Sequence, residues 1–250
     1  GYKLEVALNG STVQVREFQP DTMRVRATLS QVSAKGWVKP EQLSVTVAAE
    51  NLFGTPAQDR KVEGSLVLRP AFPAFADWPG YRFYDPQRAK DGYDETLGDQ
   101  TTGKDGKAEF KLDLTKYEKA TYQLSFLARV FEPGSGRNVA AQASTLVSAN
   151  PYLAGIKSVD DLNYVKRGDK RIVQLLAIGP DGRALAVNGL HAVVVEKRYV
   201  SVLTKMDSGL YRYVSKERKY DGPDRAMDLP ASATSFALPT DKPGSYALEM

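Results

Sequence analysis

Apolar and polar residues alternate with a period of two along much of the chain, and this pattern constrains the fold more than any other sequence feature. A strand that lies on a core sends every second side chain inward, so the alternation predicts half-buried strands of antiparallel sheets. The longest run covers residues 122–130, and shorter runs cover residues 23–29, 43–49 and 108–114. We therefore expect an all-β chain.

Asparagine–glycine and aspartate–glycine pairs divide these runs. Such pairs supply the positive φ that the primed turns between paired strands require. They occur at positions 9–10, 91–92, 105–106, 181–182, 188–189 and 221–222. Because no segment keeps an amphipathic helical period for more than about three turns, we predict tandem antiparallel β-sandwiches of the immunoglobulin or fibronectin type III kind.

The length of 250 residues is sufficient for one large core or two modest ones. A small polar stretch that ends in a proline, residues 148–151, breaks the preceding strand. Beyond it the strand pattern begins again, with successive short strands predicted at residues 172–178, 192–196, 199–203 and 210–214. We place a domain boundary there. One sandwich is predicted in residues 1–149 and a second in residues 150–250.

The two ends of the chain resemble each other. Residues 1–6 read Gly-Tyr-Lys-Leu-Glu-Val, and residues 244–250 read Gly-Ser-Tyr-Ala-Leu-Glu-Met, with one inserted serine. If this echo marks equivalent points of neighbouring modules, residues 1–17 are the last hairpin of a preceding domain and the second sandwich lacks its own last hairpin. We then expect residues 3–8 to lie at an edge and not in the middle of the first sandwich's sheet.

Composition excludes several classes of function. The chain has no cysteine and one histidine, so it has no disulfide, thiol nucleophile or thiolate zinc site. Its net charge of +4 comes from 34 basic and 30 acidic residues, which describes a mixed surface and favours nucleic acid or anionic lipid only weakly, so we predict no nucleic-acid partner. No apolar run approaches the roughly 20 residues of a membrane helix, and the first residues predict a strand and not a signal peptide. In an exported protein, this piece would come from the middle.

Individual ionisable residues suggest little chemistry. His191 lies next to an apolar strand without a nucleophile motif, and Asp160 and Asp161 are typical of a turn or cap. The acidic stretch at Asp91, Asp94, Glu95 and Asp99 offers oxygens for calcium but fits no known calcium loop closely. We predict no catalytic, cofactor-binding or metal-ligating residue, no cofactor and no enzymatic activity.

Basic and aromatic residues interleave between residues 197 and 220. Such a face could stack bases or sugars, but the acidic residues among them favour a strand with one packed and one solvated face.

The segment 70–106 departs from the strand pattern. It holds seven aromatic residues among four prolines, and long loops of this kind are functional or fold into a cap of their own. One interpretation is a ligand platform. We favour the other, a hydrophobic flap that covers a sheet edge or docks on the adjacent module.

Three stretches, taken in order, resemble the macroglobulin-like domains of bacterial alpha-2-macroglobulins. Residues 43–68 contain a strand, a Gly-Thr-Pro corner and a second strand that begins Val-Glu-Gly. Residues 105–137 contain Asp-Gly-Lys-Ala-Glu-Phe and, later, Val-Phe-Glu-Pro-Gly-Ser-Gly-Arg. Residues 196–213 contain Glu-Lys-Arg-Tyr-Val-Ser-Val and Gly-Leu-Tyr-Arg-Tyr.

The resemblance implies framework modules of a large periplasmic protein, tethered to the membrane by a lipid outside this piece, that traps proteases. It implies two kinds of partner: neighbouring macroglobulin-like domains and, through the parent protein, target proteases. The family's thioester needs a cysteine, which is absent here. We interpret the Lys- and Arg-rich residues 216–225 as a loop and not as the family's bait segment. The resemblance also implies small polar interfaces that permit the modules to rearrange.

Two other functions remain open at this point. The chain could be a carbohydrate- or peptide-binding sandwich or adhesin that uses the aromatic loop 70–106, or an accessory part of a glycan-processing enzyme.

Overall fold

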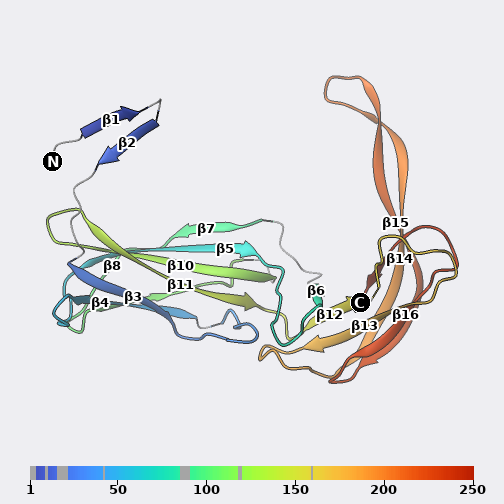
Figure 1. The fold of residues 1–250 in the computed structure, drawn as a ribbon, viewed down its shortest axis with the longest axis horizontal. Helices are drawn as coiled ribbons and strands as arrows, with labels where there is room; N and C mark the ends of the chain where they lie inside the picture. Colours follow the sequence, from blue (N-terminus) through green and yellow to red (C-terminus); the bar gives the residue numbers. More distant parts are fainter. Residues whose placement is uncertain are drawn as a thin grey trace.

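The computed structural model describes residues 4–8, 11–15, 22–41, 43–84, 91–117, 120–158 and 160–250, with the backbone alone for 4–8, 11–15 and Tyr84. The regular elements in these ranges are strands, and no helix among the described residues is long and apolar enough to cross a membrane. The strands build two β-sandwiches arranged end to end, plus a separate hairpin (Figure 1). The predicted fold class is confirmed.

The first sandwich has one sheet in the order β11-β10-β5-β7, with β8 also paired to β5, and a second sheet in the order β3-β4-β9. Its strands are β3 (Met23–Leu29), β4 (Ser44–Asn51), β5 (Lys61–Pro70), β7 (Tyr93–Thr96), β8 (Gln100–Thr101), β9 (Lys107–Lys111), β10 (Thr121–Phe131) and β11 (Asn138–Ser148).

The core of the first sandwich follows the alternation in the sequence. On β10 every second residue from Tyr122 to Val130 is buried, and Val45 and Val47 of β4 face them from the other sheet. Phe110 of β9 packs on Phe126, with ring centroids 5.2 Å apart. Large apolar groups from both sheets therefore fill one continuous core, which is what the pattern predicts.

The second sandwich consists of a sheet in the order β16-β13-β12-β6 and a sheet in the order β15-β14-β17. Its strands are β12 (Leu153–Ser158), β13 (Arg171–Ile178), β14 (Val187–Lys205), β15 (Tyr211–Leu229), β16 (Thr234–Leu238), β17 (Ser245–Glu249) and β6 (Arg82–Tyr84). Its core contains Val173, Leu175, Ala177, Ala192, Leu229 and Phe236. Strand β6 comes from the chain between β5 and β7 of the first sandwich, so the sandwiches share a segment.

The hairpin of β1 (Leu4–Leu8) and β2 (Ser11–Val15) forms a sheet of its own. Within the described backbone, the ladder of β1 is with β2 alone. The expectation that residues 3–8 do not enter the middle of the first sandwich's sheet therefore holds for the described strand.

The aspartate–glycine and asparagine–glycine pairs fall into two groups. Gly106 and Gly182 have φ of 73° and 76° and lie in turns, as predicted. The turns predicted at 188–189 and 221–222 are wrong, because both pairs lie inside strands next to register shifts of the β14–β15 ladder, where a bulge accommodates the glycine. The pair at 91–92 leads into β7, and the pair at 9–10 lies outside the described residues.

Strands β14 and β15 form one hairpin with 19 residues on each side, and its far end projects away from the second sandwich (Figure 1). The sequence predicts separate short strands here and a loop at residues 216–225. Both predictions are wrong, because these residues pair across the ladder from Val187↔Leu229 to Lys205↔Tyr211. The stretch is polar because both of its faces meet solvent, and not because it is a loop.

Candidate functional site

Outside the two cores, the junction between the sandwiches combines strand pairing, aromatic packing and hydrogen bonds. After β5 the chain leaves the first sandwich as residues 71–84, which we call the docking segment, and ends in β6 on the edge strand β12 of the second sandwich. In this ladder Phe83 lies opposite Gly155, and Arg82 opposite Ile156. A segment of one sandwich thus extends a sheet of the other, the mode of recognition known as strand addition.

Aromatic side chains of the docking segment fill the space between the sandwiches. Phe75 packs edge-on against Phe83 at 4.9 Å between ring centroids, and Trp37 lies 6.1 Å from Phe75. Leu153, Leu176 and Ile178 of the second sandwich complete this buried cluster. Aromatic pairs in such geometry contribute about 0.5–1.5 kcal/mol each beyond the area they bury.

Hydrogen bonds fix the orientation of this cluster. The Trp78 indole N–H donates to the carbonyl oxygen of Gly182 at 2.8 Å, and the Trp37 indole N–H donates to that of Asn150 at 3.2 Å. The backbone N–H of Trp37 donates to Pro180 at 3.0 Å. Each indole therefore has an apolar body inside the junction and a satisfied polar edge.

Three glycines at the junction lie so close to neighbouring atoms that a Cβ at these positions would collide with them. A Cβ on Gly36 would lie 2.1 Å from the carbonyl oxygen of Pro180, and one on Gly182 would lie 2.3 Å from that of Lys35. The ring of Phe83 covers Gly155 in the same way, with 2.7 Å from a built Cβ to the nearest ring carbon. Glycines thus allow the loops 33–38 and 179–183, and the ring of Phe83, to approach closely.

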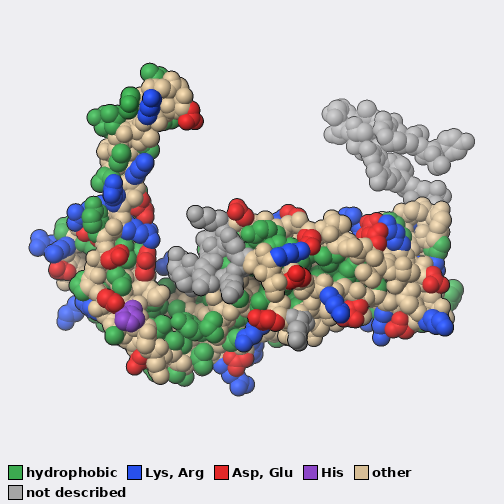
Figure 2. All heavy atoms as spheres, turned by 180° about the vertical axis from the view of Figure 1, so that it is seen from behind, with side chains coloured by type: hydrophobic (Ala, Val, Ile, Leu, Met, Phe, Trp, Pro, Cys, Tyr) green, Lys and Arg blue, Asp and Glu red, His purple; other side chains and the backbone are tan. Residues whose placement is uncertain are grey.

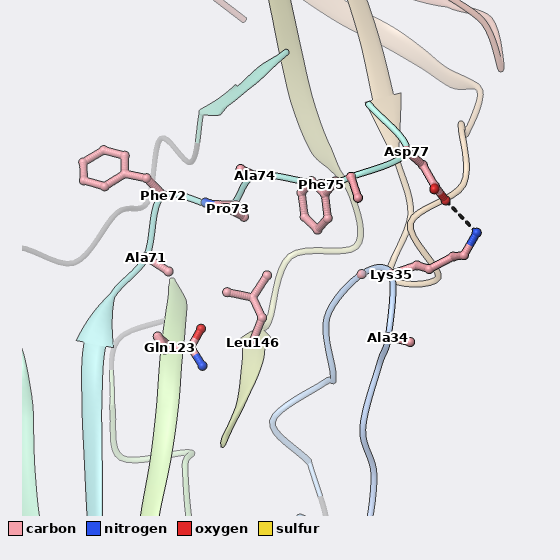
Figure 3. Close-up of a pocket in the computed structure, with 12 residues that line it drawn as sticks. Ala34, Lys35, Ala71, Phe72, Pro73, Ala74, Phe75, Asp77, Gln123 and Leu146 are labelled. Atoms are coloured by element: carbon pink, nitrogen blue, oxygen red, sulfur yellow. Dashed lines mark hydrogen bonds and ion pairs between the residues drawn. The ribbon is translucent and has the colours of Figure 1, made fainter. Parts of the chain in front are cut away.

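A hollow of about 390 Å³ lies on the rim of the junction, lined by residues 34–36, 71–77, Gln123 and Leu146. Figure 3 shows that Phe75 and Leu146 face the hollow, whereas Phe72 points away from it. The Lys35 Nζ and an Asp77 carboxylate oxygen pair at 2.8 Å beside it, on exposed side chains. This surface pair contributes little to stability, and the hollow is otherwise lined by uncharged side chains.

These contacts decide between the two interpretations of the aromatic segment. Phe75 and Phe83 are buried, and Trp78 and Tyr81 pack against the same cluster. The predicted flap that docks on the adjacent module is confirmed. A continuous aromatic platform is not formed by the described rings, because Phe75, Trp78, Tyr81 and Phe83 lie in the junction and Tyr93 packs on the core of the first sandwich, which leaves Phe72 exposed.

The predicted small polar interface between modules is wrong at this junction. The contact is aromatic at its centre and includes a strand pair and hydrogen bonds from loop 33–38 to Pro180 and Asn150. Loop 33–38 was not expected to take part, because it has no apolar period. The one signal in the sequence is a tryptophan directly after a glycine, in a stretch bounded by Lys35 and Lys39.

The acidic residues near position 95 face cations of the protein itself. Asp94 accepts two hydrogen bonds from Arg69 at 2.8 and 2.9 Å, and Asp99 pairs with Lys61 at 3.0 Å. Glu95 accepts from Lys116 and Tyr117, both at 2.5 Å. No cluster of three or more metal-ligating side chains is found in the described part of the chain.

The Glu95 contacts also shift acid–base equilibria. The hydrogen bond from Lys116, and then that from Tyr117, holds the pKa of Glu95 below its ordinary value of 4.5. Partial burial, followed by the Glu95 carboxylate, raises the pKa of Tyr117 above its ordinary value. This is the behaviour of a structural ion-pair network that joins β7 to the loop before β10.

The remaining candidates lie apart from one another. The His191 Nδ1 is 2.9 Å from the Asp224 carboxylate on the exposed surface of the β14–β15 hairpin. An Asp161 carboxylate oxygen accepts from the backbone N–H of Asn163 at 2.9 Å, which is a turn contact. The interleaved basic and aromatic residues lie on the projecting hairpin, where Arg198 pairs with Glu196 at 2.6 Å.

The described residues define a class: a tandem β-sandwich protein whose main structural site is the junction between its two sandwiches. The family model that matches the chain is the bacterial alpha-2-macroglobulin MG5 domain, over residues 23–148. The chain therefore belongs to the bacterial alpha-2-macroglobulin family. Two of the three stretches that resemble this family, 43–68 and 105–137, lie inside the match.

Relatives extend the similarity over nearly the whole chain. The chain is 41% identical over 241 residues to an alpha-2-macroglobulin homolog of Yersinia pestis and 43% identical over 247 residues to an alpha-2-macroglobulin of Pasteurella multocida. These alignments cover 96% and 98% of this chain but 12% and 13% of the relatives. The chain thus spans about an eighth of the curated relatives it matches.

Solved structures show the same fold. The chain superimposes on a crystal structure of Salmonella alpha-2-macroglobulin reacted with methylamine with a TM-score of 0.63 and 20% identity, over 95% of this chain and 16% of that one. For the native conformation of the Escherichia coli protein the TM-score is 0.64 at 21% identity, over 96% and 16%. At these identities the likeness concerns the fold alone.

Proposed function

We propose that this chain is a pair of framework modules of a longer bacterial protein that traps proteases. The observation that carries the proposal is the junction: the two sandwiches are joined by a shared strand and a buried aromatic cluster. Such a contact fixes the position of one sandwich relative to the other, and so the separation of any elements attached to them. This is what a framework does. The relatives, an alpha-2-macroglobulin and an alpha-2-macroglobulin homolog, support the wider role.

The division into modules forms part of this proposal. We place the first module in residues 1–149 and the second in residues 150–250, with residues 1–17 as the last hairpin of a preceding module. We assign no catalytic residue and no cofactor to either. The partners are neighbouring macroglobulin-like domains and, through the longer protein, target proteases. We place that protein in the periplasm, anchored by a lipid outside this piece.

The first experiment compares the longer protein with the 250-residue chain. Each is incubated with trypsin and with elastase, and protease complexes are measured by size-exclusion chromatography. We expect a stable complex with the longer protein and none with the 250-residue chain. Inhibition of a protease by the 250-residue chain, or turnover of a substrate by it, would contradict a framework role.

The second experiment tests the junction in the longer protein. Phe83→Ala removes a ring from the buried cluster, whereas Phe53→Ala removes one that is 97% exposed. We expect Phe83→Ala to reduce the yield of protease complex severalfold and Phe53→Ala to leave it unchanged. Equal yields for both variants would show that trapping does not depend on this junction.

A further inference from the structure

The projecting end of the β14–β15 hairpin is a surface that the framework role leaves without a partner. Strand β17 pairs with β14 at Val193–Lys197, so beyond this point residues 198–218 form a ribbon of two strands. We call residues 198–218 the arm. Figure 1 shows the arm extending away from both sandwiches. A two-stranded ribbon is marginally stable in water by itself, because it has no third strand or opposing layer.

Large apolar side chains are concentrated on this arm. Six of the 15 exposed large hydrophobic residues found among the described residues lie on the arm. Single exposed apolar residues are ordinary, but a contiguous group marks an interaction surface. Figure 2 shows hydrophobic side chains along the projecting hairpin.

The ladder places four of these residues on one face. Leu203 lies opposite Tyr213, Lys205 opposite Tyr211, and Tyr199 opposite Glu217. Directly opposed residues share a face in an antiparallel pair, and the face repeats every second residue. Tyr199, Leu203, Tyr211 and Tyr213 therefore form one aromatic face, with exposed fractions of 68%, 51%, 64% and 71%.

The other face of the arm carries valines and cations in place of aromatic rings. It carries Val200, Val202 and Val214, which are half-buried, together with Arg212 and Lys216. Residues 198–219 contain six basic and two acidic side chains, so this short stretch carries as much net positive charge as the whole chain. Two of the six cations, Arg198 and Lys219, are paired with Glu196 and Glu249.

We propose that the aromatic face of the arm docks on an apolar surface of another module of the same longer protein. The proposal rests on the framework role above. About seven eighths of the curated relatives' length lies outside the part this chain matches, which supplies candidate surfaces. The aromatic face itself carries Lys205 and Glu217, whose charges cancel, whereas Arg198, Arg212, Lys216 and Arg218 lie on the other face.

The junction provides a physical precedent within this structure. There, an aromatic segment that leaves one sandwich is held by the next sandwich through its rings and its backbone. The arm offers the same two elements, an aromatic face and the outer edge of β15, which pairs with β14 alone among the described strands. Tyrosine is well suited to such a contact because it buries a large ring at low cost in conformational entropy and keeps a hydrogen-bonding hydroxyl.

The test is site-specific photocrosslinking in the longer protein, without any protease present. A benzoylphenylalanine is placed at Leu203 on the aromatic face or, as a matched control, at Thr204 on the opposite face. We expect the Leu203 probe to crosslink to residues of the same molecule outside residues 1–250, at least fivefold more than the Thr204 probe. Crosslinks to a second copy, or equal yields from both probes, would overturn the proposal.

A second measurement does not depend on the probe. Hydrogen exchange of residues 198–218 is compared between the longer protein and the 250-residue chain. We expect at least tenfold slower exchange in the longer protein, and loss of this protection in the double variant Leu203→Ser/Tyr213→Ser. Equal exchange in the two proteins would overturn the docking. Both readouts are independent of protease trapping, so a docked arm in a protein that fails to trap would contradict the framework function alone.

Discussion

At the scale of single residues, the structure separates groups that resemble functional sites from groups that hold the fold. Glu95 has the perturbed pKa that is common at active sites, but its causes are hydrogen bonds from Lys116 and Tyr117 on the surface of the first sandwich. A carboxylate stabilised in this way favours folding while it is ionised, and this gives a pH signature that can be measured.

We expect Glu95→Gln to lower the free energy of unfolding by about 1 kcal/mol at pH 7, because the amide replaces a charged acceptor with a neutral one. The folded-state pKa of Glu95 lies below the unfolded value, so its stabilisation is present above the unfolded pKa and is lost as the pH falls through the folded pKa. Urea denaturation of both proteins at pH 7 and pH 3 should show this difference shrink at pH 3. Glu109→Gln, at an exposed position on β9, is the control. A difference that stays constant with pH would contradict the assignment.

Gly36 gives a second prediction at this scale. Its φ is not in the positive range, so alanine is unfavourable here because of space and not because of backbone strain. The added methyl group would meet the carbonyl oxygen of Pro180 at 2.1 Å, and backbone atoms yield only if a loop moves. We expect Gly36→Ala to destabilise the protein by about 2 kcal/mol in chemical denaturation. Gly98→Ala, where no atom lies within 4 Å of a built Cβ, should be neutral. Equal stability of the two variants would disprove the close approach.

At the scale of elements, the docking segment is the part that joins one sandwich to the other. Both tryptophans of the chain lie in the junction, so tryptophan emission reports this region selectively. Loss of docking should therefore be visible without any label.

We expect Phe83→Ala to cost about 3 kcal/mol, because it empties a buried site between Phe75 and Gly155. Tryptophan emission should shift to longer wavelength, and hydrogen exchange should accelerate in β6 and β12, while β10 stays protected. Phe53→Ala, on a side chain that is 97% exposed, should change none of these readouts. Unchanged emission in Phe83→Ala would show that the ring does not hold the segment.

The elements also show how far the sequence predicts the structure. The alternation in residues 122–130 predicts which side chains are buried. On a strand with one face on a core, the apolar residues of the alternation must face that core. The same logic fails for β14 and β15, because half of their length projects into solvent, where both faces mix polar and apolar residues and neither covers a core. The aromatic residues of 70–106 predict a docking flap. Their partners in loops 33–38 and 179–183 cannot be predicted, because contacts between loops leave no periodic signal.

At the scale of the whole molecule, the junction determines whether the two sandwiches move separately. Small polar contacts between modules permit rearrangement, whereas apolar contacts with a shared strand oppose it. Here the buried aromatic cluster and the β6–β12 ladder join the cores of the two sandwiches. If the longer protein rearranges in its proposed role, we expect the pair to turn as one body and the hinges to lie at other contacts.

This rigidity has a calorimetric consequence. A chain of 250 residues with two cores commonly unfolds in two steps, and a single step requires strong coupling between the cores. We expect the 250-residue chain to show one transition, with a ratio of calorimetric to van't Hoff enthalpy near 1. Phe83→Ala should divide it into two, the second sandwich melting first because it loses its edge strand β6, and Phe53→Ala should leave it single. Two resolved transitions in the unmodified chain would show that the sandwiches are coupled too weakly to act as one body.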